Sequence, residues 1–353
     1  MFKKTLISLS VLGCMAAAGV VSAQECSQEN WQACAGKPWV DGDTMDTPLG
    51  SKWWPNPLWG ADDEAGSTNW YTKPEVVMRA LSQVKEGKTY KLGFEYHSGM
   101  PLFGARSFAL RIPGTPNGGP FGGNSIVWND DFLATEIGQV GTQFDGLGHI
   151  GVQLGSNGDM AQMRWYNGFT EAEIATPYGL TKLGTEKLHP IVARGVLIDF
   201  AALKGVDTIE KGTCMTVDDI TAALEKQGMA DFKLMEGDAV LFHYGWERHW
   251  EDPDTFNSGS PGLCAETAYW LAEQKIGVTG GDTWNATDTV PYPGEACAFC
   301  VHQILQTRNG IVNQENLRLK QLADDGAYVF AYIYSPTPIR GATGSMGSPI
   351  AIK

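Results

Sequence analysis

The segment most able to do chemistry runs from Gly138 to His149 and reads Gly-Gln-Val-Gly-Thr-Gln-Phe-Asp-Gly-Leu-Gly-His. Its reactive groups all stand at odd positions: the amides of Gln139 and Gln143, the carboxylate of Asp145 and the imidazole of His149. An extended chain points alternate side chains to one face, so these four groups are predicted to share one side of a strand. A carboxylate near an imidazole can hold and transfer a proton, which makes this segment the first candidate site.

Glycines at 141, 146 and 148 let the backbone of this segment bend and let another group approach it closely. Two interpretations follow from the residue types. One is a catalytic or binding face, and the other is a glycine-rich turn in which Asp145 and His149 hydrogen-bond locally. The sequence contains neither a P-loop nor a Gly-x-Ser-x-Gly nucleophile motif, so phosphate-loop and serine-hydrolase chemistry are not indicated.

Three further residues are candidates for lining a substrate pocket. His243 ends an apolar run, where a core position is the alternative interpretation, and Asp282 follows a short apolar run, where an Asx-turn is the alternative. Arg106 is suited to bind a substrate carboxylate, although a surface ion pair is the favoured interpretation of this residue. We therefore carry His243 and Asp282 forward as possible pocket residues.

Helices and strands are predicted to be mixed along the chain, without the regular alternation of a doubly wound sheet. Helical spacing and capping residues predict helices over 73–84, 217–227, 264–274 and 300–307. Thr216 is the predicted N-cap of the second of these helices. Apolar runs predict strands over 89–94, 107–112, 191–200, 238–244, 276–278 and 328–334. The pattern predicts one α/β domain with a mixed or antiparallel sheet.

The composition is that of a globular protein with an acidic surface. The 353 residues include 40 acidic and 26 basic side chains, which gives a formal net charge of −14. Binding to nucleic acid or to an anionic membrane surface requires clustered Lys and Arg, so neither partner is expected. A hydrophobic content of 43% with 12 Trp is enough to bury a sizeable core, and it excludes a disordered chain.

Residues 1–23 are predicted to be a signal peptide. Lys3 and Lys4 precede an apolar run over 6–21, and small residues at 21–23 suit cleavage before Gln24. Residues 24–58 are then expected to form an extended N-terminal segment, and 59–353 the main domain. The predicted location is the periplasm or the exterior of the cell, with no membrane association after cleavage.

Of the seven cysteines, one lies in the predicted signal peptide, so six remain in an oxidising compartment that permits disulfides. Cys26 and Cys34 are the favoured pair because they are close together in a loop-like stretch. The Cys297–Cys300 motif is open to a redox or zinc interpretation. Its cysteines are also open to bridges with Cys214 or Cys264, or to a role as buried thiols.

The segment over 139–149 resembles the signature of the cyclase family that includes kynurenine formamidase, isatin hydrolase and a trans-dienelactone hydrolase. The family signature, His-x-Gly-Thr-His-x-Asp-x-x-x-His, appears here as Gln-Val-Gly-Thr-Gln-Phe-Asp-Gly-Leu-Gly-His. Other stretches similar to the family follow in the family's order, over 59–69, 194–199, 237–241 and 302–317. The resemblance therefore covers about residues 50–335.

This resemblance implies a metal site and a proton carrier. In the family, the signature residues, a later His and a Glu surround one or two divalent metals, and the last His of the signature is the general base or acid. Carried over position by position, the metal-site residues are Gln139, Gln143, Asp145, His302 and Glu315. The spacing after His302 places the glutamate at Glu315 or at a neighbouring residue. His149 takes the role of the proton carrier.

The two glutamines depart from the family pattern, because an amide oxygen is a weaker ligand for zinc than an imidazole. The implied cofactor is a divalent metal, manganese or zinc, and a site without metal is the alternative. Without metal, the glutamine amides are candidates to stabilise an oxyanion, with His149 and Asp145 as the base and its orienting group.

The function implied by the resemblance is hydrolysis of a small amide, imide or lactone. A binding protein with an eroded metal site is the alternative function, and a cyclase or isomerase that uses the same base without water is a third. The resemblance also implies an α/β fold with a β-barrel-like sheet core surrounded by helices, and a homo-oligomer. The expected partner is a small-molecule substrate.

Overall fold

A computed structural model describes residues 46–47, 50–51, 53–154, 158–285, 287–293 and 298–353. The expectations about the signal peptide, Cys26, Cys34 and Cys297 lie outside these residues. Within the described ranges, no helix is long and apolar enough to cross a membrane.

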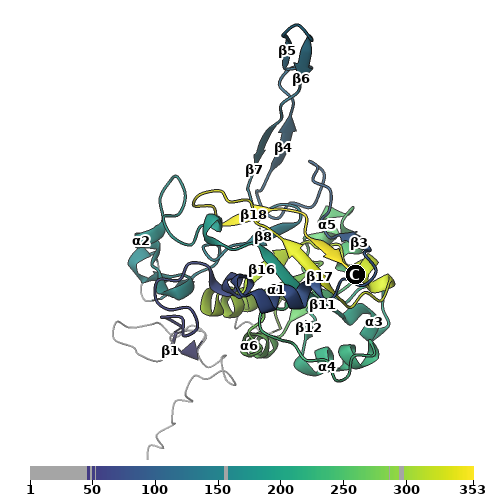
Figure 1. Cartoon of the computed structure of the whole chain (residues 1–353). Helices are drawn as coiled ribbons and strands as arrows, with labels where there is room; N and C mark the ends of the chain where they lie inside the picture. The colour runs from purple at the N-terminus through teal and green to yellow at the C-terminus, as the bar shows by residue number, and fades with distance from the viewer. Residues whose placement is uncertain (1–45, 48–49, 52, 155–157, 286, 294–297) are drawn as a thin grey trace, which may run out of the picture.

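The centre of the fold is a nine-stranded mixed sheet that curls like half a barrel, with helices around it (Figure 1). Across the sheet, the strands are β18 (Gly344–Met346), β8 (Gln143–Asp145), β16 (Val312–Glu315), β15 (Val278–Gly281), β13 (Ala239–His243), β11 (Ile191–Asp199), β17 (Val329–Tyr334), β19 (Ile350–Ile352) and β3 (Thr89–Lys91). The four strands β16, β15, β13 and β11 are parallel to one another, and all other pairings in the sheet are antiparallel. The predicted α/β fold with a barrel-like sheet is therefore confirmed.

The central strands β11 and β13 are buried on both faces, and their side chains alternate between two apolar cores. Val196, Ile198 and Phe242 pack into one core. Leu197 and Leu241 point the other way, into the second core. This alternation explains why both strands appear in the sequence as continuous apolar runs.

The predicted helices are present in the structure. They are α1 (Pro74–Leu81), α4 (Val217–Lys226), α6 (Ala265–Glu273) and α7 (Cys300–His302), with α3 (Phe200–Lys204) and α8 (Lys320–Asp324) in addition. Helix α1 packs against β11, and α4 packs against α3 and β11. The predicted cap of α4 is confirmed, because the Thr216 hydroxyl accepts from the Asp219 backbone N–H while the Asp219 carboxylate accepts from the Thr216 N–H.

Helix α7 does not continue as an α-helix to residue 307 as expected. It passes into a π-helical stretch, η7 (Gln303–Arg308), directly after His302. Such stretches are rare and occur mostly at functional sites.

Apart from the four strands described in the next paragraph, the remaining elements are α2 (Glu171–Ile174), α5 (Pro253–Phe256), η2 (Gly66–Thr72), η3 (Met160–Gln162), η4 (Tyr166–Gly168), η5 (Thr185–Lys187), η6 (Trp246–His249), β1 (Asp46–Thr47), β2 (Gly50–Ser51), β9 (Val152–Gln153), β10 (Met163–Arg164), β12 (Cys214–Met215) and β14 (Gly262–Leu263).

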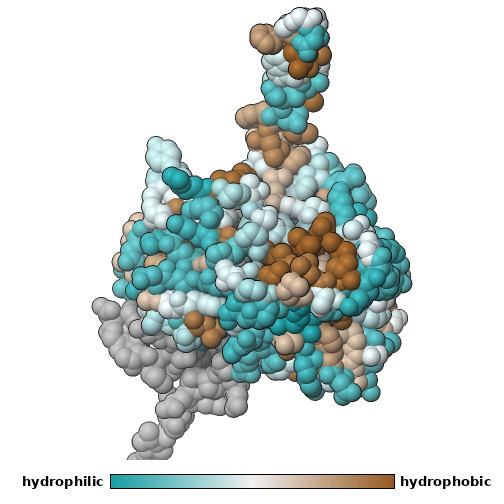
Figure 2. Space-filling view, viewed as in Figure 1, coloured by the Kyte–Doolittle hydropathy of each residue, from teal (hydrophilic) through white to brown (hydrophobic). Residues whose placement is uncertain are grey.

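A two-stranded arm projects from the body of the molecule (Figure 1). It pairs β4 (Phe108–Arg111) with β7 (Phe132–Thr135) and, farther out, β5 (Gly118–Phe121) with β6 (Ile126–Trp128). Figure 2 shows apolar side chains along this arm. Those between 40% and 71% exposed include Leu110, Phe121, Ile126, Val127, Trp128, Phe132 and Leu133. The predicted strand over 107–112 thus exists, but it belongs to the arm and not to the main sheet.

Candidate functional site

The strand pair β8–β16 brings together the first four groups of the site. These two strands are antiparallel, and Gln143 lies opposite Glu315 while Asp145 lies opposite Asn313. Alternate residues of a strand point to the same face, so all four side chains face the same way. The sequence predicted that residues 139–149 form one strand with a shared polar face. Only residues 143–145 are a strand, and Gln139 and His149 reach the site from bends on either side of it.

His302 completes a buried cluster with the carboxylates of Asp145 and Glu315. Its Nε2 atom lies 3.3 Å from Asp145 Oδ2 and 3.3 Å from Glu315 Oε1. One ligand atom from each of the three residues lies within 4.8 Å of the others, and all three residues are buried. The glutamate of the cluster is thus Glu315 itself and not a neighbouring residue.

Asp288 orients His302, and sequence reasoning missed this residue. Its Oδ2 atom accepts from the backbone N–H of His302 at 3.0 Å and lies 2.5 Å from Nδ1 of the same residue. Its Oδ1 atom accepts from the Val301 N–H at 2.9 Å. A carboxylate on the second ring nitrogen is the usual partner of a metal-binding histidine. No local pattern around Asp288 in the sequence indicates this role.

Burial and mutual charge set the protonation of the cluster. Burial raises the pKa of Glu315 to about 8, the Asp145 carboxylate adds to the rise, and His302 opposes it. Burial also acts to raise the pKa of Asp145, but His149 and His302 outweigh it and hold this pKa below its usual value. Burial acts to lower the pKa of His302, but the surrounding carboxylates raise it well above its usual value. The cluster therefore needs a positive charge between its carboxylates, supplied by a proton or by a metal ion.

The residues present fit a divalent metal with three protein ligands. Asp145, His302 and Glu315 offer two carboxylates and one imidazole, a set suited to manganese or zinc, and Asp288 holds the imidazole in place. Asn313 also enters the cluster, with its Nδ2 atom 3.1 Å from His302 Nε2. Asn313 is two residues before Glu315 on a strand, so its side chain is expected on the same face as Glu315. This spacing was the signal in the sequence for the role of Asn313.

The two glutamines, which the resemblance places among the metal-site residues, form hydrogen bonds with the carboxylates of the cluster. Gln139 donates from Nε2 to Asp145 Oδ1 at 3.0 Å, and its Oε1 atom accepts from Arg106 at 2.8 Å. Gln143 donates from Nε2 to Glu315 Oε2. Both amides thus present N–H donors to the carboxylates of the cluster. Arg106 is bound to this network at 2.8 Å, and it forms no ion pair with any residue that the structure describes, whereas the sequence favoured a surface ion pair.

His149 stands at the edge of the cluster. Its Nε2 atom lies 3.9 Å from Asp145 Oδ1, and its Nδ1 atom lies 3.3 Å from Gln139 Nε2. Burial lowers the pKa of His149, and the Asp145 carboxylate opposes this only in part. The ring is therefore neutral at pH 7 and able to accept a proton.

A cavity of about 180 Å³ opens onto the cluster. Its lining includes His149, His302 and Glu315 from the cluster and Arg106 from the base of the arm. Its walls include Phe103, Trp284 and Phe299. The rings of Phe103 and Trp284 stack with centroids 4.2 Å apart. The site therefore combines one apolar wall with a small set of converging polar groups, as ligand pockets do.

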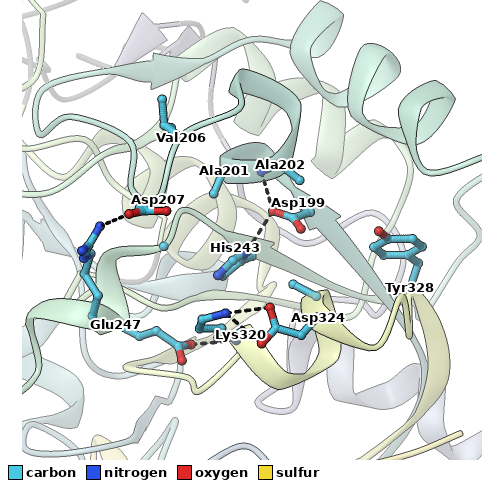
Figure 3. Close-up of a pocket in the computed structure, with 13 residues that line it drawn as sticks. Asp199, Ala201, Ala202, Val206, Asp207, His243, Glu247, Lys320, Asp324 and Tyr328 are labelled. Carbon is cyan, nitrogen blue, oxygen red and sulfur yellow. Dashed lines mark hydrogen bonds and ion pairs between the residues drawn. The ribbon is translucent and has the colours of Figure 1, made fainter.

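His243 and Asp282, the two possible pocket residues, are not part of this cavity lining. His243 lines a second, larger cavity (Figure 3). Asp282 is fully buried beside it, where its carboxylate accepts from the backbone N–H groups of Tyr244 and Glu247. The structure thus brings His243 and Asp282 to each other, in a group with Glu247.

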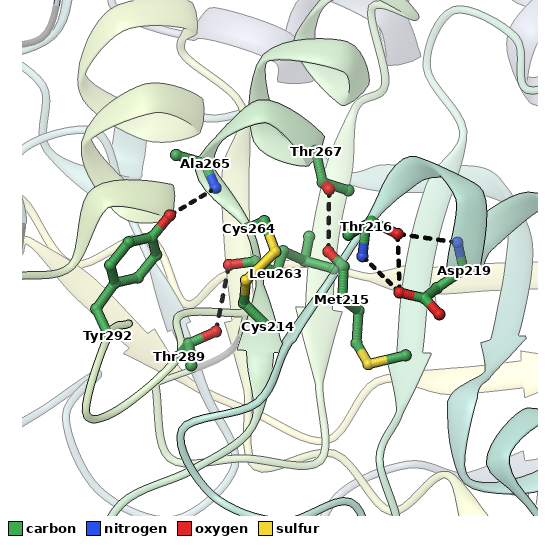
Figure 4. The surroundings of a disulfide bond; sticks show 10 residues. All are labelled: Cys214, Met215, Thr216, Asp219, Leu263, Cys264, Ala265, Thr267, Thr289 and Tyr292. Atoms are coloured by element: carbon green, nitrogen blue, oxygen red, sulfur yellow. Dashed lines mark hydrogen bonds between the residues drawn. A yellow bond between two sulfur atoms is a disulfide. The ribbon is translucent and has the colours of Figure 1, made fainter. Parts of the chain in front are cut away.

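A disulfide supports the segment that carries Asp288. Cys214 is bonded to Cys264, where β12 runs beside β14 (Figure 4). Leu263, the last residue of β14, bridges to Asp288 and donates its N–H to the Thr287 carbonyl at 2.7 Å. This pairing excludes one of the alternatives left open by the sequence, a bridge from Cys214 or Cys264 to the Cys297–Cys300 motif. Cys300 is also disulfide-bonded, contrary to the zinc and buried-thiol interpretations of that cysteine.

Comparisons with known proteins agree with this fold. The chain matches the family model Cyclase, described as "Putative cyclase", over residues 90–288. A crystal structure of a novel cyclase is 30% identical with a TM-score of 0.71, and the match covers 86% of this chain and 100% of that one. No curated protein sequence matches significantly.

Two more distant structures share the fold. Isatin hydrolase A from Ralstonia solanacearum is 19% identical with a TM-score of 0.53, and the match covers 75% of this chain and 92% of that one. An isatin hydrolase bound to the product analogue thioisatinate is 18% identical with a TM-score of 0.51, and the match covers 78% of this chain and 94% of that one.

The half-barrel sheet defines a hydrolase-like fold of the cyclase and isatin hydrolase type. The chain belongs to the Cyclase family. The resemblance seen in the sequence is thereby confirmed.

Proposed function

We propose that this chain is an exported hydrolase that opens a small amide, imide or lactone with the help of one divalent metal, Mn²⁺ or Zn²⁺. Asp145, His302 and Glu315 hold the metal in this proposal. His149 is the general base and then the general acid. The supporting observation is a neutral imidazole that faces the cavity directly beside a buried carboxylate cluster that needs a cation.

Each side chain has a role that its position suggests. A bound divalent metal polarises a carbonyl group and lowers the pKa of water. His149 accepts the proton of the attacking water and returns it to the leaving nitrogen or oxygen. Asp145, 3.9 Å from the His149 ring, stabilises the imidazolium that forms in between. Gln139 and Arg106 fix the orientation of this carboxylate through a chain of hydrogen bonds.

The cavity limits the substrate to a small molecule. About 180 Å³ is close to the size of a cavity that admits benzene. The aromatic wall formed by Phe103, Trp284 and Phe299 suits a flat ring, and Arg106 offers a positive charge to a carbonyl or carboxylate oxygen. An amide, imide or lactone in or beside a ring meets these requirements. One protein of similar fold is an isatin hydrolase bound to a product analogue, which is consistent with this class.

The first test is the metal content of the purified mature chain, with and without exposure to Mn²⁺ and Zn²⁺. We expect about one equivalent of metal per chain at the cluster of Asp145, His302 and Glu315. We also expect turnover of at least one member of a panel of lactones, formamides and cyclic imides. His149→Ala is expected to reduce kcat by roughly 10²–10⁴-fold while substrate still binds. His97→Ala, which removes an exposed histidine, is the matched control and should retain activity.

The alternative function is a small-ligand-binding protein on the same fold. The observation that favours it is the pair of glutamine N–H donors where the family pattern has histidines. An absence of metal under every loading condition, together with ligand binding without turnover, would contradict the hydrolase proposal. Loss of ligand affinity in His149→Ala, with no turnover to lose, would support the binding protein.

We also propose that the chain forms a homo-oligomer through its arm. An isolated two-stranded hairpin is at most marginally stable in water, and exposed apolar patches of this kind mark interaction sites. The apolar side chains along both strand pairs of the arm are consistent with burial against a second copy of the chain.

The proposed location, in the periplasm or outside the cell, follows from the predicted signal peptide.

A further inference from the structure

A second cluster of ionisable side chains lies at the carboxyl ends of three neighbouring parallel strands. Asp199 is the last residue of β11, His243 is the last residue of β13, and Asp282 directly follows β15. The strand register pairs Asp199 with His243. In open α/β sheets, ligands bind outside the carboxyl ends of the strands. A cavity of about 480 Å³ opens at this edge of the sheet (Figure 3).

His243 is held with one ring nitrogen free. The residue is only 7% exposed, and its Nδ1 atom lies 2.8 Å from Asp199 Oδ1. No other described residue forms a hydrogen bond with the His243 ring, and the residue lines the cavity, so Nε2 has no such partner among the described residues. Figure 3 shows the ring with Asp199 on one side and Glu247 on the other. A carboxylate on the far nitrogen is the arrangement that orients metal-binding histidines.

The carboxylates of Glu247 and Asp282 lie close to the His243 ring. One ligand atom each from His243, Glu247 and Asp282 lies within 4.8 Å of the other two. Backbone donors fix both carboxylates: Asp282 accepts from the N–H of Tyr244 at 2.9 Å, and Glu247 Oε2 accepts from the N–H of Lys320 at 3.0 Å. No described residue donates to Glu247 Oε1, which remains available as a ligand atom.

The charges around the cluster leave it short of positive charge. The two basic residues of the cavity lining are bound to other acids: Arg248 lies 3.0 Å from Asp207, and Lys320 lies 2.6 Å from Asp324. The three carboxylates of Asp199, Glu247 and Asp282 thus face one imidazole. Buried carboxylates that outnumber their cations are destabilising unless a further cation joins them. A bound divalent metal would supply positive charge that the described side chains do not.

We propose that His243, Glu247 and Asp282 form a second divalent-metal site, with Zn²⁺ as the ion that fits best. An imidazole with two carboxylates is a three-ligand set typical of zinc, whereas Ca²⁺ and Mg²⁺ prefer oxygen ligands alone. His243 and Glu247 also line the cavity, so an ion held there would be next to the space that a ligand can enter. This proposal concerns a different set of residues from the cluster around Asp145 and does not depend on the proposed hydrolase activity.

The direct test is X-ray diffraction from crystals of the mature chain grown with ZnCl₂, recorded above and below the zinc absorption edge. We expect an anomalous peak about 2.0–2.2 Å from the ligand atoms of His243, Glu247 and Asp282. A peak at the Asp145 cluster alone, or no peak at either place, would overturn the second site. The same crystals grown with MgCl₂ should leave the His243 position without an ion.

A titration with Zn²⁺ by calorimetry tests the site in solution. In the Asp145→Ala variant, which disables the first cluster, the chain should still bind one equivalent of Zn²⁺. Adding His243→Ala to this variant should weaken its affinity for Zn²⁺ at least tenfold. Glu247→Gln should act in the same direction while it keeps an oxygen for the Lys320 N–H. His249→Ala, on the same short helix η6 but outside the cluster, is the control and should not change the affinity.

Because His243 is buried, circular dichroism must show that each variant is folded before its affinity is compared. Unchanged zinc affinity in folded His243→Ala and Glu247→Gln would overturn the proposal. If His243→Ala does not fold, Glu247→Gln and the anomalous peak of the wild-type crystal decide the question.

Discussion

At the level of single residues, Asp288 is expected to control metal affinity without touching the metal. Asp288→Asn removes the charge that faces His302 and places an N–H donor where an acceptor is needed. Loss of such an orienting carboxylate typically reduces metal affinity by 10–100-fold. The measurement is the Kd of Mn²⁺ and Zn²⁺ by calorimetry. Asp254→Asn, at an exposed aspartate, is the control, and an unchanged Kd in Asp288→Asn would contradict the positioning role.

The protonation of Glu315 predicts a specific pH dependence of stability in the metal-free protein. Its pKa in the folded chain is about 8, because burial and the Asp145 carboxylate disfavour its charge, and this lies above the ordinary value. The folded state therefore binds a proton that the unfolded state has already released, and stability falls as the pH rises towards 8. The raised pKa of His302 acts in the same direction. The lowered pKa of Asp145 acts the opposite way, but only in more acidic solution.

Thermal unfolding in EDTA at pH 6 and pH 8.5 checks this prediction. We expect a Tm that is several degrees lower at pH 8.5, and a smaller difference in Glu315→Gln. Added Mn²⁺ should stabilise the wild type more at pH 8.5 than at pH 6, because the metal replaces protons on its ligands. A Tm in EDTA that rises with pH in the wild type, with the same slope in Glu315→Gln, would contradict the assignment.

At the level of elements, helix α4 offers a matched pair of threonines. Thr216 forms a capping box with Asp219, whereas Thr221 lies exposed within the helix and donates its hydroxyl to the Val217 carbonyl. Thr216→Ala is expected to lower the free energy of unfolding by about 1 kcal/mol, because a helix-end N–H loses its acceptor. Thr221→Ala should leave it within about 0.5 kcal/mol of the wild type, since alanine favours helix. Urea unfolding measures both, and equal effects would show that the cap is energetically unimportant.

At the level of the whole molecule, the arm is expected to hold copies of the chain together. Leu110→Asp with Phe132→Asp places two charges on its exposed apolar surface, which should reduce the assembly to a monomer. Light scattering coupled to gel filtration gives the mass. The control is Met78→Asp with Leu81→Asp, which alters exposed apolar residues of α1 and should leave the mass unchanged. Dissociation by the control and not by the arm variant would move the interface to α1.

Local sequence patterns were sufficient to predict much of the framework. Thr216 begins α4 as predicted because capping acts within one helical turn. The apolar runs that became β11 and β13 were recognisable because both faces of these strands are buried. The helix after Cys300 was predicted at its start, but no local pattern indicated its change to a π-helix after His302.

For the candidate site, the sequence determined the residue types, and the resemblance to a known family linked Asp145 to His302 and Glu315. Only the tertiary structure decided how they meet, because the register between β8 and β16 joins positions more than 150 residues apart. Tertiary structure also decided the roles of Asp288, which contacts His302, and of Arg106, which reaches Asp145 through Gln139. Hydrogen bonds between distant segments leave no periodic trace in the chain, and the same is true of the cluster around His243.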